Sequence, residues 1–185
     1  EAFDGTIDKE LLSNLRSNIY MFSAAKTFQQ VRDMQSMLTD DNKTLDYRTF
    51  RDRVKQTYST YNEAYLQTEY VTAMTAGHNA INYRSAYKDR KLFTQLKYVA
   101  IEDQHTSEIC RRLDGTIANT DDKFWHIHTP PSHFNCRCHI EKISIYDEAI
   151  PNSPGQLSEI ADYVDKRMRP EFKFNSGITE TAFPK

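Results

Sequence analysis

The sequence of 185 residues predicts a mostly α-helical α+β protein, with long N-terminal helices followed by a small antiparallel sheet that carries a Cys/His-rich loop. Two observations predict this class. Residues 6–114 contain no proline and a single glycine, Gly77, which is typical of long helices. All six prolines, all three cysteines and five of the six histidines follow from residue 105 onward, so the chain changes character near residues 95–115.

The first half of the chain predicts helices. Apolar residues recur at three- and four-residue steps, which indicates one or two amphipathic helices over residues 6–37. A polar break follows at residues 39–44, and helix is predicted again over residues 46–90. A stripe of small side chains on this second helix predicts close packing against another element: Ala73, Ala76 and Ala80.

Eight of the eleven tyrosines lie between Tyr47 and Tyr98. Tyrosine suits protein interfaces, so one interpretation is a docking surface. The other is aromatic packing between helices. We expect four methionines to fill the core in the same way, namely Met21, Met34, Met37 and Met74.

The second half predicts short strands around one helix. Alternating apolar residues indicate strands over residues 96–101, 124–128 and 140–145, and a short helix is predicted over residues 106–113, stopped by Gly115. Such a sheet is too small to be stable alone. It must therefore pack on the long helix or be held by a further interaction.

A Pro/Gly-rich break at residues 151–155 precedes one more amphipathic helix over residues 157–168, which we expect Pro170 to end. Residues 171–177 are predicted to be extended.

Composition and charge exclude some classes of protein. The chain has 24 Lys and Arg against 26 Asp and Glu, a net charge of −2, which argues against binding to nucleic acid or membrane by bulk charge. Without tyrosine and with glycine, apolar residues make up about 35%, against about 45–50% in ordinary domains. We therefore expect part of the buried surface to belong to a contact with another chain, including a second copy of this one.

No apolar run is long enough to predict a membrane span, and no charged-then-apolar leader is visible. Because residue 1 is Glu1, we expect the natural chain to start earlier.

The residues with the strongest chemistry form a Cys/His cluster. Zinc is bound by four Cys or His donors in a structural site, and Cys110, His133, Cys136 and Cys138 supply that number. Such a site would compensate for the small sheet, because metal binding contributes directly to folding. The Cys-x-Cys spacing requires a sharp local turn. Four other histidines could replace His133 as ligand: His105, His126, His128 and His139.

Other interpretations of the cluster stay open. The cysteines could be reduced packing thiols, or Cys110 could form a disulfide with one loop cysteine. Cys136 and His133 could act as nucleophile and base, although no oxyanion arrangement accompanies them. We expect Arg137 to pair with Asp103 or Asp114, or to face solvent.

Two other groups of charged residues have the composition of a functional site. Asp103, His105 and Asp114 could hold a catalytic metal in a nuclease. Arg84, Lys88, Arg90 and Lys91 form the best basic cluster, which indicates a solvated helix end rather than a DNA site.

Three motifs carry a resemblance to a known family. They are Thr68-Glu69 on the long helix, Asp103-x-x-Thr-Ser-x-x-Cys110-x-x-x-Asp-Gly115, and Pro130-Pro-x-His133-x-x-Cys-Arg-Cys138. Together they resemble the phage Mu F-like family, the minor head (head morphogenesis) proteins of tailed phages and prophages, which include the SPP1 minor head protein. Gln67 and His105 stand where the family usually has arginine.

The resemblance implies a low-copy, non-enzymatic structural protein inside the capsid. It implies association with the portal and other capsid proteins, and a role in head assembly or delivery of packaged DNA, with the host cytoplasm as the place of assembly. We expect a helical arm over residues 1–59, the Mu F-like module over residues 60–146 and a C-terminal extension over residues 147–185. The alternative function is a toxin-like effector with hydrolase or nuclease activity built on the Cys/His cluster.

Overall fold

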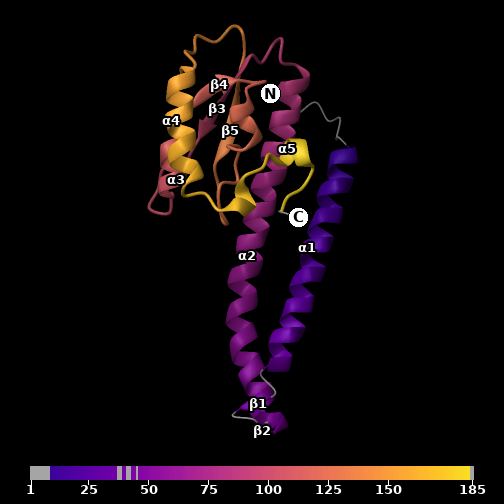
Figure 1. Ribbon diagram of the computed structural model, residues 1–185. Coiled ribbons are helices and arrows are strands. Elements are labelled where there is room, and N and C mark those ends of the chain that lie inside the picture. The colour runs from indigo at the N-terminus through magenta and orange to yellow at the C-terminus, as the bar shows by residue number, and fades with distance from the viewer. Residues whose placement is uncertain (1–8, 37–38, 41–42, 45, 184–185) are drawn as a thin grey trace.

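A computed structural model gives the fold and describes residues 9–36, 39–40, 43–44 and 46–183. Two long helices form an antiparallel hairpin, and a compact body built around a three-stranded sheet lies against one end of it (Figure 1). The rest of the hairpin extends beyond the body. The predicted class, mostly helical α+β with a small antiparallel sheet, is confirmed.

The hairpin consists of α1 (Lys9–Ser36) and α2 (Tyr47–Lys88). Residues 6–8 and 37 of the first predicted helix lie outside the described part. The carboxylate of Asp46 begins α2, because it accepts hydrogen bonds from two backbone N–H groups of the first turn. At the tip of the hairpin β1 (Thr39–Asp40) pairs antiparallel with β2 (Lys43–Thr44).

The sheet of the body has the order β4-β3-β5, with every pair antiparallel. The central strand β3 (Gln95–Val99) lies between β4 (Ile117–Asn119) and β5 (His139–Ile143). The predictions for the central strand and the last strand are confirmed.

The strand predicted over residues 124–128 was wrong. The chain forms a 3₁₀ turn, η1 (Lys123–His126), capped by the carboxylate of Asp122. Phe124 and Trp125 are adjacent and both buried, which a strand with one solvent face does not allow. The third strand is instead β4, which is too short to give a clear alternation.

Helix α4 (Pro154–Asp165) covers one side of the body and follows a capping box formed by Ser153 and Gln156. It ends before Pro170, which begins a second 3₁₀ turn, η2 (Pro170–Phe172). The extended tail predicted for residues 171–177 was therefore wrong. The tail folds into η2 and α5 (Ser176–Thr179), and α5 packs against α2 (Figure 1).

Two hydrophobic clusters hold these elements together. The larger fills the body around Leu96, Tyr98 and Trp125, and helix α3 (Glu108–Leu113) contributes buried side chains to it. The smaller joins α1, α2 and the C-terminal segment, and its members are Leu11, Leu15, Ala76, Ala80, Ala182 and Phe183. The predicted packing of the small residues on α2 is thereby confirmed.

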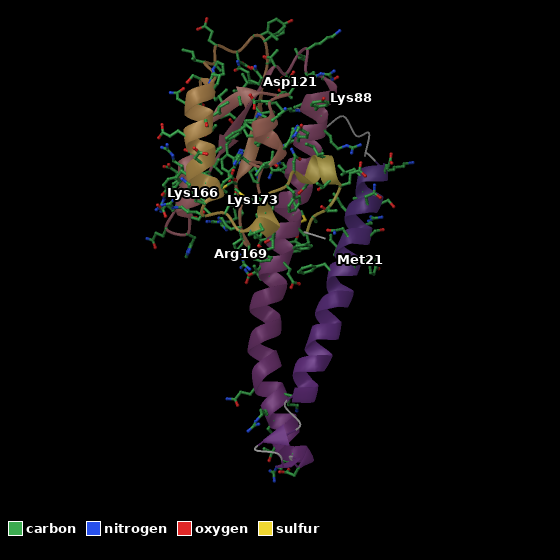
Figure 2. The ribbon with its side chains drawn as sticks, viewed as in Figure 1. Met21, Lys88, Asp121, Lys166, Arg169 and Lys173 are labelled. Carbon is green, nitrogen blue, oxygen red and sulfur yellow. The ribbon has the colours of Figure 1, made fainter. Side chains whose placement is uncertain are left out.

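The aromatic and methionine side chains divide between core and surface. Tyr83 and Tyr98 are buried, whereas Tyr70 is 66% exposed. The prediction that methionines fill the core was wrong for Met21 and Met74, which are 74% and 57% exposed. Figure 2 labels Met21 on α1. The side chains of Met34 and Met37 lie outside the described part of the chain.

Among the described residues, no helix combines the length and the apolar character needed to cross a bilayer. The division of the chain into three segments stays a prediction.

Candidate metal centre

The short helix α3 places Cys110 in the body. Ser107 caps the helix by accepting a hydrogen bond from the Cys110 N–H at 3.2 Å. The helix ends at Leu113, and Gly115 turns the chain away just after it with a φ of 71°, which other residues rarely adopt. The thiol of Cys110 thus points into the core, where it is 1% exposed.

The loop before β5 makes the sharp turn that the Cys-x-Cys spacing requires. Asn135 adopts a left-handed conformation with φ 61°, which asparagine tolerates better than most residues. The Cys136 N–H donates to the carbonyl of His133 at 3.3 Å and closes the turn. His133 and Cys136 therefore lie on the same side of the loop.

A polar strip on α2 holds this loop in place. The Thr72 hydroxyl accepts from the Asn135 N–H at 2.8 Å, and the Thr75 hydroxyl donates to the Cys136 carbonyl at 2.6 Å. Asn79 donates to the Cys138 carbonyl at 3.2 Å and accepts from the Ile140 N–H at 2.8 Å.

Sequence reasoning missed this strip, whose members are Thr72, Thr75 and Asn79. Their spacing of three and four residues is a signal, since it places all three on one helix face beside the alanine stripe.

The loop and α3 bring three potential donor atoms together. The Cys110 Sγ lies 3.3 Å from His133 Nε2 and 3.8 Å from Cys136 Sγ. The donor atoms of the three residues all lie within 4.8 Å of one another, so this group could hold a metal ion. The predicted fourth residue, Cys138, is not part of this group, but its thiol is 5% exposed and interacts with the thiols of Cys110 and Cys136.

Further polar groups surround the donors. His133 Nδ1 lies 2.7 Å from the carbonyl oxygen of Phe134, which accepts a hydrogen bond from it. The Tyr98 hydroxyl donates to Cys110 Sγ at 3.5 Å and lies 3.0 Å from the Ser132 hydroxyl. Burial and the three neighbouring thiols raise the pKa of Tyr98, so its hydroxyl keeps its proton.

The thiols influence one another strongly. Hydrogen bonds from Cys136 and Cys138 lower the pKa of Cys110 well below its usual range. The interaction with Cys110 raises the pKa of both other cysteines. All three are free thiols in the structure, so the alternative of a disulfide between Cys110 and a loop cysteine is not observed.

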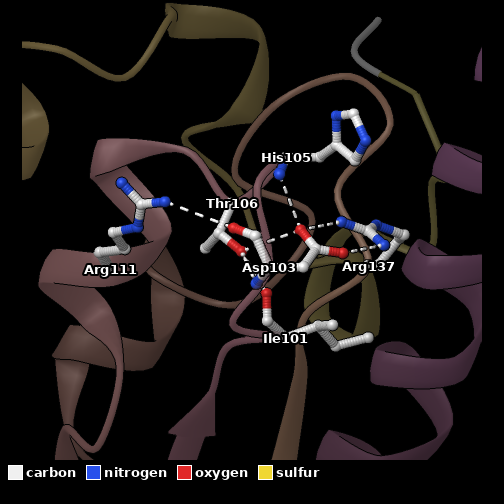
Figure 3. A network of polar contacts seen from close by, with 6 residues as sticks. All are labelled: Ile101, Asp103, His105, Thr106, Arg111 and Arg137. Atoms are coloured by element: carbon white, nitrogen blue, oxygen red, sulfur yellow. Dashed lines mark hydrogen bonds and ion pairs between the residues drawn. The ribbon is translucent and has the colours of Figure 1, made fainter.

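An ion pair fixes the outer side of the cluster (Figure 3). Arg137, between the two loop cysteines, contacts Asp103 at 2.7 Å, and the same carboxylate accepts from the His105 N–H at 2.8 Å. These contacts, Arg137 first, lower the pKa of Asp103 from 3.8. Thr106 adds hydrogen bonds to Ile101 and Asp103. The predicted pairing of Arg137 with Asp103 is confirmed.

The other candidate ligands named from the sequence have different surroundings from the three grouped donors. Asp114 accepts from the Ala100 N–H at 2.7 Å. His128 is buried and contacts the Phe124 carbonyl and Asp165. His139 pairs with Glu141 at 3.5 Å. His105 lines the same small cavity as Cys110, His133 and Cys138, but its side chain is exposed.

The basic cluster at the end of α2 is partly neutralised. Arg84 forms an ion pair with Glu180 at 2.5 Å, and Arg90 stacks over the ring of Tyr87. These contacts agree with the interpretation of a helix end rather than a DNA site.

The arrangement suits binding better than catalysis. A nucleophile must be reached by its substrate, and Cys110 and Cys136 are each 1% exposed. The adjoining cavity of about 10 Å³ has room for one water-sized body. Soft thiolates and an imidazole are the donor set of a structural zinc site.

Comparisons with known proteins match parts of this chain. The family model described as "Phage Mu protein F like protein" matches residues 29–141. "Putative capsid assembly protein F" of Escherichia phage Mu is 32% identical over 79 residues, which cover 43% of this chain and 18% of the relative. "Mu-like prophage FluMu F protein" of Haemophilus influenzae is 31% identical over 81 residues, 44% of this chain and 19% of the relative. The matched segment thus spans less than a fifth of either relative's length. No solved structure gives a significant match.

Proposed function

The chain belongs to the phage Mu protein F-like family, and from this premise we propose that it is a minor, non-enzymatic structural protein of a phage or prophage head. It binds the portal and other capsid proteins, and it aids head assembly or DNA delivery. Its place is the interior of the capsid, and the host cytoplasm during assembly.

The observation that carries this proposal is the family match over residues 29–141. This range includes most of the hairpin, the sheet and the whole Cys/His loop. One relative is named for capsid assembly, in keeping with a role in building heads.

The shape of the molecule supports a binding role. The hairpin of α1 and α2 extends well beyond the body and offers a long surface to a partner (Figure 1). Large side chains are exposed on both helices, among them Tyr20, Met21, Tyr70 and Met74. Exposed tyrosine and methionine suit an interface, because both give large contact areas. We assign the portal contact to this surface, hereafter the hairpin surface.

The charge of the chain does not favour direct binding of packaged DNA. A net charge of −2 supplies little general attraction to phosphate. We therefore propose that any assistance in DNA delivery depends on position beside the portal rather than on tight binding of DNA.

Co-purification with the portal tests the function. The chain is expressed with the portal protein encoded beside it in the same phage or prophage, and one partner alone carries an affinity tag. We expect a complex that survives size-exclusion chromatography. A portal protein from an unrelated phage serves as the control and should not be retained.

The complementary test uses particles. Mass spectrometry of purified heads should detect the protein at a few copies per head, and deletion of its gene should reduce the yield of infectious particles. Heads that lack the protein while its gene is expressed would contradict the proposal. Hydrolysis of nucleic acid or peptide that is lost in His133→Ala, with the fold intact, would favour the alternative of a toxin-like effector.

A further inference from the structure

We propose that Cys110 Sγ, His133 Nε2, Cys136 Sγ and Cys138 Sγ form a structural Zn²⁺ site that joins α3, the Cys/His loop and the start of β5. The proposal is independent of the portal interaction, since it concerns the stability of the body. It rests on distances, on the surroundings of the donor atoms and on the position of the site in the fold.

Two distances between donor atoms are close to those of a tetrahedral ion. With a Zn–S bond of about 2.3 Å, two sulfur ligands of a tetrahedron lie about 3.8 Å apart. The distance from Cys110 Sγ to Cys136 Sγ is 3.8 Å. A sulfur and an imidazole nitrogen should lie about 3.6 Å apart, and the distance from Cys110 Sγ to His133 Nε2 is 3.3 Å.

The imidazole of His133 is oriented for coordination. Its Nδ1 lies 2.7 Å from the Phe134 carbonyl, and a carbonyl can only accept a hydrogen bond, so Nδ1 carries the proton. Nε2 of the neutral ring then presents its lone pair to the cysteines. Metal-binding histidines almost always use their second nitrogen in this way.

The fourth ligand is Cys138. Its thiol interacts with both of the other thiols, and it lines the same cavity as Cys110 and His133. The carbonyl of Cys138 is already held by Asn79 of α2 at 3.2 Å. The backbone of this residue is thus held beside the other three donors, and we propose that its thiol completes the tetrahedron.

Charged and polar groups lie beside the filled site. Binding of Zn²⁺ displaces the thiol protons to solvent, so that three thiolates, a neutral imidazole and the ion together carry one negative charge. Arg137 supplies a positive charge between two of the ligands, and the Tyr98 hydroxyl donates a hydrogen bond to Cys110 Sγ. These groups are the outer partners that tune metal–thiolate sites.

The position of the site explains what the metal would do. A three-stranded sheet with one short edge strand has little core of its own. Bonds to α3 and to the loop that leads into β5 would tie segments that are distant in sequence into one unit. Metal binding would then stabilise the body in the way that structural zinc stabilises other small domains.

Metal content and thiol reactivity test the proposal on the full chain. The protein is purified without a metal-affinity step and assayed for zinc. We expect about one zinc per chain, thiols that do not react in the native state, and a fall in the melting temperature of at least about 10 °C after chelation, reversed by Zn²⁺. A metal-free protein with three reactive thiols and a melting temperature unaffected by Zn²⁺ overturns it.

Cobalt and matched variants identify the ligands. Tetrahedral Co²⁺ absorbs strongly in the visible, and its thiolate charge-transfer band grows with the number of cysteine ligands. We expect this band to fall by about one third in Cys138→Ser. His133→Ala should lose at least tenfold in affinity, whereas His105→Ala, at the other histidine of the cavity, should behave as the unaltered protein.

Retention of full affinity in His133→Ala, or its loss in His105→Ala, overturns the ligand set. Circular dichroism shows which variants fold. If His133→Ala does not fold, the cobalt spectrum of the unaltered chain shows whether the metal site is tetrahedral. Intense tetrahedral bands support the site, and the weak spectrum of a six-coordinate ion overturns it.

Discussion

At the scale of single residues, the Cys/His loop depends on polar side chains that reach it from α2. Asn79 is 2% exposed and joins the Cys138 carbonyl to the Ile140 N–H. The sequence predicted Cys110, His133, Cys136 and Cys138 as one group, and the first three are gathered within 4.8 Å. It did not predict Asn79, because a single asparagine on a helix has the same local signature whether it faces solvent or a loop about 60 residues away.

Replacement of Asn79 should destabilise the body. In Asn79→Ala a buried N–H and a buried C=O lose their partner, and each such loss costs about 1–3 kcal/mol. We therefore expect the free energy of unfolding to fall by about 2–4 kcal/mol, measured by urea denaturation. Asn82→Ala is the matched control, since Asn82 is half-buried and donates a long hydrogen bond of 3.4 Å to the Ile140 carbonyl. Equal losses in the two variants would contradict this role.

The pair of Asp103 and Arg137 predicts a dependence on pH. Arg137 lowers the pKa of Asp103 below 3.8 in the folded state. A carboxylate with a lowered pKa stabilises the fold above its ordinary pKa, and this contribution disappears as the pH falls through the lowered value. Asp103→Asn should therefore melt below the unaltered protein at pH 7, and the difference should shrink progressively below about pH 4.

The control for this prediction is Asp162→Asn, which removes an exposed carboxylate on α4. It should alter the melting temperature little at either pH. A gap between Asp103→Asn and the unaltered protein that widens on acidification would exclude the ion pair as its cause.

At the scale of elements, the long helices, α3 and the outer strand β5 were predictable because each has a clear period or cap. The turn η1 was mistaken for a strand, since Asp122 caps a local turn in which Phe124 and Trp125 are both buried. The tail was mistaken for extended chain for a different reason. Asn175 accepts from the Gly177 N–H and donates to the Trp125 carbonyl, and the second of these bonds depends on a distant segment.

The close approach of α5 to α2 leaves little room for a side chain at Gly177. A Cβ at this position would lie 3.0 Å from the Ala80 carbonyl oxygen and 3.0 Å from the Tyr83 ring. Since backbone blocks one side, Gly177→Ala should displace the C-terminal segment and cost about 1–3 kcal/mol.

Urea denaturation measures this cost, and Gly155→Ala is the control. The Cβ of residue 155 would lie 4.0 Å from the nearest side-chain atom, and alanine favours the helix that contains it. The control variant should therefore be as stable as the unaltered protein or slightly more stable. A neutral Gly177→Ala would show that α5 does not pack as closely as described.

At the scale of the whole molecule, the family and the fold class were predictable, because spaced motifs and helix periods can be recognised within short stretches of sequence. The sequence did not predict whether these large side chains lie in the core or on the surface, since methionine and tyrosine suit a core and an interface equally well. Only the fold shows that Met74 and Tyr70 face solvent on the hairpin.

The hairpin surface should therefore tolerate charge without loss of stability. We expect Tyr70→Glu and Met74→Glu together to leave the melting temperature nearly unchanged and to weaken the portal complex at least tenfold, about 1.4 kcal/mol or more. Tyr146→Glu is the control, because Tyr146 is 82% exposed in the loop after β5 and belongs to neither helix of the hairpin. Equal weakening by both changes would place the portal contact elsewhere.

The C-terminal segment lies where the first helix must dock. Asn18 of α1 accepts from the backbone N–H groups of Ala182 and Phe183, the ring of Phe183 stacks on Phe22, and Glu180 accepts from Asn14. On the ribosome α1 emerges well before these residues, because they lie more than 160 positions further along the chain. The apolar side chains of α1 that pack on this segment therefore stay uncovered until the segment has been synthesised. A partner present during synthesis would meet this face of α1 before residues 180–183 cover it.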